Sequence, residues 1–197
     1  MRRLLIILTG ILVPMLAAAQ AQIDTKKVKI SDFTQKITKV AIFGFSTSSS
    51  AATLPLNLKT TTEDLGVDEK IGSFVLPLGM TINMNGTAIM QVVATLFIAG
   101  CAGYDVTFVQ LVVIALLALI ASAGTPAAPG AGAIILFTIL SGLGYVNEGA
   151  LMAYSLILAI NRPIEMLVTA LNVVGDSATA VYVAKSEGLL DETKYNA

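Results

Sequence analysis

Residues 161–176, which read NRPIEMLVTALNVVGD, carry a line of polar side chains through an apolar segment. At 100° per residue, the polar residues that share one helical face about 80° wide are Asn161, Glu165, Thr169, Asn172 and Asp176. The surrounding run, residues 146–184, is mostly apolar and, at about 1.5 Å rise per residue, is longer than a bilayer core of about 30 Å. We therefore predict one long amphipathic membrane helix over residues 146–184.

The polar face of this helix is unsuited to lipid. Two ionised carboxylates, Glu165 and Asp176, would raise the free energy of membrane insertion by roughly 5 to 7 kcal/mol at the middle of a helix. Each Leu or Val lowers it by only about 0.3 to 0.6 kcal/mol. We expect the face to turn toward the interior of a helix bundle, where intramembrane polar residues mark a path for a substrate or an ion.

Composition indicates an integral membrane protein. Of 197 residues, 55% are hydrophobic and 13% charged, and the mean hydropathy is +0.81. Between residues 71 and 160 only Asp105 and Glu148 are charged, so there is no basic patch for nucleic acid. The sequence has no histidine and one cysteine, Cys101, which excludes an intrachain disulfide and an ordinary zinc site and leaves no usual nucleophile and base for an enzyme.

Residues 1–22 form an N-terminal hydrophobic segment with two interpretations. Two arginines, an apolar run and the ending Ala19-Gln20-Ala21 resemble a cleaved signal peptide. Five lysines follow between residues 26 and 39, and they outweigh the two arginines in selecting the cytoplasmic side. An uncleaved helix with its carboxyl end inside fits this lysine bias better.

Residues 32–66 predict a first helical hairpin. Two apolar arms, each too short to cross a bilayer, flank a tip of consecutive hydroxyl residues, 46–50, and lysines flank both arms. We expect a hairpin that enters the membrane and returns to the cytoplasmic side. The alternative from composition alone is a serine-rich linker.

Residues 71–101 are long enough to span, but TINMNGT interrupts their middle. Polar and glycine residues at bilayer depth leave backbone groups that only protein or a water-lined cavity can satisfy. A broken helix follows, whose unwound carbonyls are free to coordinate a small cation. The alternative is a simple loop turn.

Residues 106–144 predict a second hairpin around ASAGTPAAPGAGA, with glycines at 124, 130 and 132 that permit tight backbone. The loops on either side lack basic residues, which places them outside. The alternative is an ordinary Gly/Pro turn between two spanning helices.

Beyond the last helix, residues 185–197 form a polar tail. Two halves, each a hairpin followed by a helix, suggest an inverted repeat with a midplane site.

Four motifs in order, FSTSSSAATLP, FVLPLGMTINMNGTA, GTPAAPGAGAI and NVVGD, give the chain a specific resemblance. Over residues 33–187 it resembles the dicarboxylate/amino acid:cation symporter family, the glutamate transporter homologues. The resemblance implies an all-α membrane protein of the cell inner membrane, multi-pass, with residues 23–197 as its transport core. It also implies an elevator mechanism, in which this core slides against a static scaffold with substrate and sodium bound between two re-entrant hairpin tips.

The resemblance carries site roles to matching positions. The implied substrate-binding residues are Ser49, Ser50, Thr87, Ala127, Ala128, Pro129, Gly130, Glu165, Val168, Thr169 and Asn172. The implied sodium-binding residues are Asn83, Asn85, Asn172 and Asp176. Glu165 stands where the family has an aspartate for the substrate amino group, since a carboxylate pairs with an ammonium in a site of low dielectric.

Three departures from the family pattern alter these expectations. Val168 stands where acidic amino acid carriers place an arginine, so a bidentate carboxylate partner is missing and a neutral amino acid is favoured over an acidic one. Arg162 lies six residues earlier, badly placed as its substitute. Asn85 replaces an aspartate that helps to bind sodium, which favours fewer coupled ions. Asn161 replaces a buried aspartate.

The chain also has roughly half the family's usual length, without the helices that form scaffold and trimer contacts. It is therefore a fragment, or a core served by a separate scaffold chain, or a protein that has lost transport. We expect sodium-coupled symport of an amino acid or dicarboxylate, by a homo-oligomer or with a scaffold chain. The alternative function is that of a non-transporting, structural membrane protein.

Overall fold

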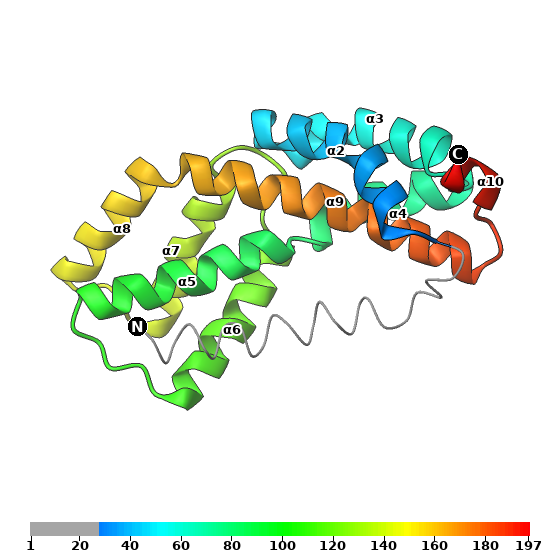
Figure 1. The fold of residues 1–197 in the computed structure, drawn as a ribbon. Helices are drawn as coiled ribbons and strands as arrows, with labels where there is room; N and C mark the ends of the chain where they lie inside the picture. The colour runs from blue at the N-terminus through cyan, green and yellow to red at the C-terminus, as the bar shows by residue number, and fades with distance from the viewer. Residues whose placement is uncertain (1–27) are drawn as a thin grey trace.

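A computed structural model describes residues 28–197, and apart from one isolated bridge between Val67 and Leu190 every regular element in this range is a helix (Figure 1). In order these are α2 (Ile30–Thr47), α3 (Ser50–Lys59), the π-helical turn η1 (Thr60–Asp64), α4 (Glu69–Ile82), α5 (Asn85–Cys101), α6 (Phe108–Ala123), α7 (Ala131–Leu143), α8 (Glu148–Ile160), α9 (Arg162–Ser186) and α10 (Glu192–Asn196). The all-helical prediction is confirmed. The prediction for residues 1–22 lies outside the described residues.

The helices α2 and α3 pack against each other as a hairpin whose tip is only Ser48 and Ser49. Ser48 has a φ of 49°, in the left-handed region, which turns the chain sharply. Ser49 caps the amino end of α3, because its side-chain oxygen accepts a hydrogen bond from the Ala52 amide. The short serine tip thus both reverses the chain and caps the second arm.

The helices α4 and α5 follow one another with a two-residue interruption at Asn83 and Met84. Asn83 has φ −92° and ψ 65°, outside helical geometry, while its amide still donates to the carbonyl of Gly79. The last carbonyls of α4 are therefore not committed to a continuous helical ladder, whereas the Met84 carbonyl already accepts from the Ala88 amide. This is where NMNGT interrupts the apolar run.

The helices α6 and α7 form a second packed pair, joined by residues 124–130. The start of α6 is set by a capping box, in which Thr107 and Gln110 exchange hydrogen bonds between side chain and backbone. The start of α7 follows Gly130, whose φ of 85° suits a residue without a side chain.

One sequence prediction about the fold is wrong: residues 146–184 do not form a single helix. The structure has α8 and α9, which meet at a bend at Asn161 (Figure 1). The cause is Pro163, in the first turn of α9. Proline has no amide hydrogen to donate to the carbonyl of Ala159, and its ring would collide with that carbonyl in a continuous helix.

The long helix α9 lies at the centre of the molecule and packs against α2, α3, α4, α5 and α8. One apolar core joins α9 to α2, α4 and α10, and a second joins α5, α6, α7 and α8. Outward side chains such as Phe74 (68% exposed), Phe97 (55%) and Ile120 (71%) are apolar. Two segments, Glu69–Cys101 and Arg162–Ser186, are long and apolar enough to cross a membrane.

The predicted polar tail contains a helix that docks on the rest of the chain. In α10, Tyr195 is 1% exposed and donates its hydroxyl to the carbonyl of Lys29. Lys36 donates to the carbonyls of Lys194 (2.6 Å) and Tyr195 (2.8 Å). Burial, and then the nearby Asp32 carboxylate, raise the pKa of Tyr195 to about 12. The tail is therefore an ordered part of the fold.

A fully buried polar cluster fastens α3 to α9. The amide of Asn57 donates to the carbonyl of Val173 (3.1 Å), and its oxygen accepts from Thr61 (3.3 Å) and from Ser177. Asn57 is 1% exposed, and Thr61 and Ser177 are 0% exposed. These groups satisfy one another away from solvent.

Replacing Asn57 with alanine should lower the free energy of unfolding by roughly 1 to 3 kcal/mol, because Thr61, Ser177 and the Val173 carbonyl each lose a hydrogen bond in a buried site. Urea or thermal unfolding in detergent measures this loss. The matched control is Asn196→Ala, which removes an exposed amide that bonds the Glu192 carbonyl. Equal loss in both variants would contradict a role for the buried cluster.

Candidate functional site

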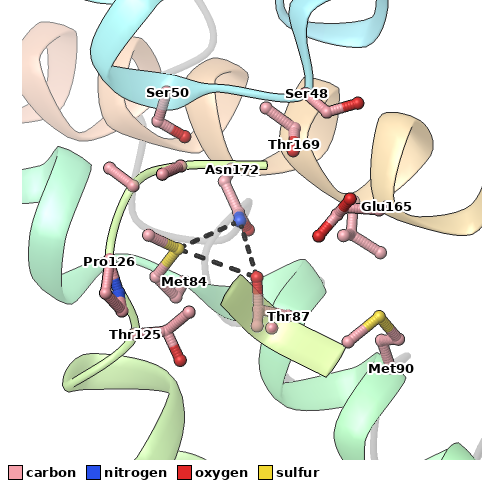
Figure 2. A pocket seen from close by; sticks show the side chains of 14 residues that line it. Ser48, Ser50, Met84, Thr87, Met90, Thr125, Pro126, Glu165, Thr169 and Asn172 are labelled. Carbon is pink, nitrogen blue, oxygen red and sulfur yellow. Dashed lines mark hydrogen bonds between the residues drawn. The ribbon is translucent and has the colours of Figure 1, made fainter. Parts of the chain in front are cut away.

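A small cavity lies where the two hairpin tips and the α4–α5 break approach α9. Figure 2 shows Ser48 and Ser50 on one side, Thr125 and Pro126 on another, and Glu165, Thr169 and Asn172 projecting from α9. The lining residues are Ser48, Ser50, Met84, Thr87, Met90, Thr125, Pro126, Ala127, Ala128, Gly132, Glu165, Val168, Thr169 and Asn172. The cavity has a free volume of about 20 Å³, room for on the order of one water molecule.

The polar face of α9 is buried, as the sequence predicts. Its five members, Asn161, Glu165, Thr169, Asn172 and Asp176, are each 6% exposed or less. On the other side of the same helix, Leu167 is 61% exposed and Leu171 is 50% exposed. The carboxylates and amides of α9 are thereby kept among polar partners, away from the apolar outer surface.

Asn172 connects α9 to the start of α5. Its oxygen accepts from the Gly86 amide (2.8 Å), and its nitrogen donates to the Thr87 hydroxyl (3.1 Å) and to the Met84 sulfur (3.4 Å). Gly86 allows this approach, because an added Cβ there would lie 2.8 Å from the carbonyl oxygen of Val168. The side chains of Asn172 and Val168 are thus held against the first turn of α5.

The two hairpin tips are bonded to each other above the cavity. The Ser49 hydroxyl donates to the carbonyl of Ala127 (2.9 Å), and the Ala51 amide donates to the same carbonyl (3.3 Å). Both contacts involve backbone of the second tip, so they depend on its conformation rather than on its side chains. The tips are closed on one another in this structure.

Glu165 has a partner on each carboxylate oxygen. Oε1 accepts from the backbone amide of Gly130 (2.6 Å), and Oε2 accepts from the Arg162 guanidinium (3.1 Å). The Glu165 side chain is 8% exposed, whereas that of Arg162 is 53% exposed. A buried carboxylate thus receives one donor from the second tip and one from a half-exposed cation.

The residues predicted to bind sodium fall into two groups. Asn83 donates to Asp176 Oδ1 (2.8 Å), and Asn85 donates to Asn83 Oδ1 (2.7 Å), which forms a chain beside the α4–α5 break. Asn172, the fourth member, lies instead in the cavity lining. Gly79 and Gly175 give the first group its room, since a Cβ would lie 2.6 Å from Asp176 Oδ1 or 2.9 Å from Asn83 Nδ2, respectively.

Comparison with known proteins decides the family. Residues 2–186 match the model of the sodium:dicarboxylate symporter family. The chain belongs to that family. The predicted membership is confirmed, and the members of this family are membrane transporters, not enzymes.

This symporter family member has curated relatives among animal transporters. It is 38% identical to the human "Excitatory amino acid transporter 2" over 186 residues, which are 93% of this chain and 31% of that protein. It is 39% identical to a Caenorhabditis elegans "Excitatory amino acid transporter" over 139 residues, 71% of this chain and 27% of that protein. The human "Excitatory amino acid transporter 5" is 36% identical over 160 residues, which are 81% of this chain and 28% of that protein. The chain spans about a third of the length of these relatives or less.

Several cavity residues of this family member were not predicted from the sequence. They are Ser48, Met84, Met90, Thr125, Pro126 and Gly132. The Ser48 hydroxyl is buried and has no hydrogen-bond partner among residues 28–197. The run of serines around it was the available signal. Methionine in an apolar chain carries no such signal.

Three predicted substrate residues lie beside the cavity rather than on its wall. Ser49 bonds Ala127, Gly130 bonds Glu165, and Pro129 directly precedes Gly130 in the second tip. The other eight predicted substrate residues, Ser50, Thr87, Ala127, Ala128, Glu165, Val168, Thr169 and Asn172, line the cavity. The structure therefore brings together groups that lie more than a hundred residues apart in sequence.

Proposed function

We propose that this chain is the transport core of a sodium-coupled symporter for an amino acid or dicarboxylate, moving by an elevator mechanism. The observation that carries the proposal is the convergence of both hairpin tips and the α4–α5 break on the buried polar face of α9. Polar groups collected at an interruption between helices in an apolar molecule are the usual means of binding a solute inside a membrane.

The proposed substrate site is the cavity below the two tips. Glu165 would bind an ammonium group, while Ser50, Thr169 and Asn172 supply hydrogen bonds to a carboxylate end. Since the cavity has room for on the order of one water molecule, a substrate requires the tips to separate. Within residues 28–197, the direct hydrogen bonds between the tips involve one carbonyl, that of Ala127. Separating the tips therefore breaks few hydrogen bonds.

The proposed sodium site includes Asp176, Asn83 and Asn85, with Asn172 at the boundary to the substrate cavity. Oxygen ligands of carboxylate, amide and carbonyl type suit a hard cation. Within the described residues, no group of three His, Cys, Asp or Glu side chains is placed to hold a metal ion. A single carboxylate with neutral oxygens suits a monovalent cation held weakly enough to be released.

The proposed setting is a multi-pass protein of the cell inner membrane, with residues 23–197 as the transport core and the pairs α2–α3 and α6–α7 as re-entrant hairpins. The second pair supports this, since α6 and α7 have 16 and 13 residues, fewer than the roughly 20 needed to span. A homotrimer or a separate scaffold chain would supply the static partner of the elevator.

Neutral amino acids should bind better than aspartate, because Val168 offers no cation to a side-chain carboxylate. Thermal-shift measurements on the purified protein, with sodium and with choline in its place, test both the preference and the proposed function. Val168→Arg should reverse the preference, and Val168→Ala is the matched control that should keep it. A preference for aspartate in the unmodified protein would contradict the assignment of Val168. Absence of binding to every amino acid would favour the alternative, a non-transporting protein.

A further inference from the structure

The negative charge of the Glu165 carboxylate is compensated by two partners within the chain itself. The Gly130 amide holds Oε1 and the Arg162 guanidinium holds Oε2, at 2.6 and 3.1 Å. No other ion pair to Glu165 is present among residues 28–197. The carboxylate proposed to bind a substrate ammonium is therefore already paired with a cation of the chain itself.

The position of Arg162 is not explained by the helix dipole or by packing. It is the first residue of α9, where the helix dipole disfavours a positive charge. Its side chain is 53% exposed, so it contributes little to a packed core. What it does contact is the carboxylate on the cavity wall, three residues further along the helix.

We propose that Arg162 is a tethered competitor for the substrate's ammonium group and so sets the affinity and the amine selectivity of the cavity; this rests on the proposed transport function. With the tips closed, Arg162 neutralises Glu165, whose buried charge would otherwise be poorly compensated. An arriving ammonium repels the guanidinium at short range. Arg162 then turns outward, where its exposed position lets water solvate it at little cost.

The proposal predicts a specific pattern of binding constants. Calorimetry with alanine at saturating sodium should give binding about fivefold tighter for Arg162→Gln than for the unmodified chain, which is the fold-change for an ion pair of about 1 kcal/mol. Lactate, which replaces the amine of alanine with a hydroxyl, should gain nothing from the substitution, because it brings no cation to compete. Arg162→Lys, which keeps the charge, should stay near the unmodified affinity.

Two controls separate this effect from general changes in charge or folding. Lys59→Gln breaks another exposed helical ion pair, with Glu63, away from the cavity, and should leave alanine binding unchanged. In the unmodified chain, raising ionic strength with choline chloride at constant sodium should tighten alanine binding, because salt screens the half-exposed pair. This second measurement needs no variant to fold.

The outcomes distinguish competition by Arg162 from the proposed transport function. Equal alanine affinity in Arg162→Gln and in the unmodified chain, with no salt dependence, would overturn the competition while leaving the transport function intact. Absence of alanine or any other amino acid binding in both proteins would overturn the proposed function and the competition with it. Binding seen only in Arg162→Gln would support both.

Discussion

Asp176→Asn should abolish the stabilisation of the protein by sodium and, with it, sodium-dependent substrate binding. Asp176 is 2% exposed and accepts from the Asn83 side chain at 2.8 Å. Asparagine keeps the shape and an oxygen for that hydrogen bond but removes the only carboxylate among the proposed sodium residues. At sodium concentrations near 100 times the dissociation constant, the unmodified chain should gain roughly 2.7 kcal/mol of stability, and the variant close to none.

Thermal unfolding at constant ionic strength, with sodium exchanged for choline, measures this effect directly. Asp105→Asn, which removes an exposed carboxylate between α5 and α6, is the control and should keep the full sodium response. If Asp176→Asn retains that response, Asp176 is not part of the sodium site. A lower melting temperature alone, without loss of the sodium response, would assign it a purely structural role.

Gly86→Ala should destabilise the protein by forcing apart two helices that meet at the site. An added Cβ would lie 2.8 Å from the Val168 carbonyl oxygen and 2.9 Å from the Val168 Cβ. Neither atom is the end of a flexible side chain, so α5 must move away from α9. Overpacking of this kind costs roughly 1 to 3 kcal/mol, sometimes more. The same movement would lengthen the hydrogen bond from the Gly86 amide to Asn172 and thereby weaken ligand binding.

The same helix provides the control for this substitution. Gly100, also in α5, has no heavy atom within 4 Å of an added Cβ. Gly100→Ala should therefore stabilise the protein by up to about 1 kcal/mol through helix propensity. Denaturant unfolding of both variants in detergent compares them. If both substitutions had the same sign and size, the close approach of α5 and α9 at Gly86 would be of no energetic importance.

The helical, membrane-embedded character of this symporter family member could be predicted because it follows from local sequence patterns. Hydropathy and a 3.6-residue period report on each segment without reference to the others. The division of residues 146–184 into α8 and α9 was missed for the same reason: the helical period of the polar face begins at Asn161 and gives no sign of a bend there. The bend depends on the missing amide hydrogen of Pro163, to which hydropathy is insensitive.

The polar face of α9 was predictable because polar side chains stand out in an apolar sequence. The cavity's methionines, Met84 and Met90, have no such contrast, and only the packing of α5 against α9 reveals them. The pairing of Arg162 with Glu165 lies between these cases. Its spacing of three residues is visible in the sequence, but that spacing alone does not show that Glu165 is buried and Arg162 is not.

Helix α9 contributes to every part of the site, with Glu165, Thr169, Asn172 and Asp176 facing different partners along one line. Each added or deleted residue in this stretch would rotate all that follows by about 100°. One such change would turn Asp176 away from Asn83 while leaving Glu165 in place, and so would uncouple the ion from the substrate. Among related sequences, insertions and deletions should therefore occur in the connection between α5 and α6 and be absent from α9.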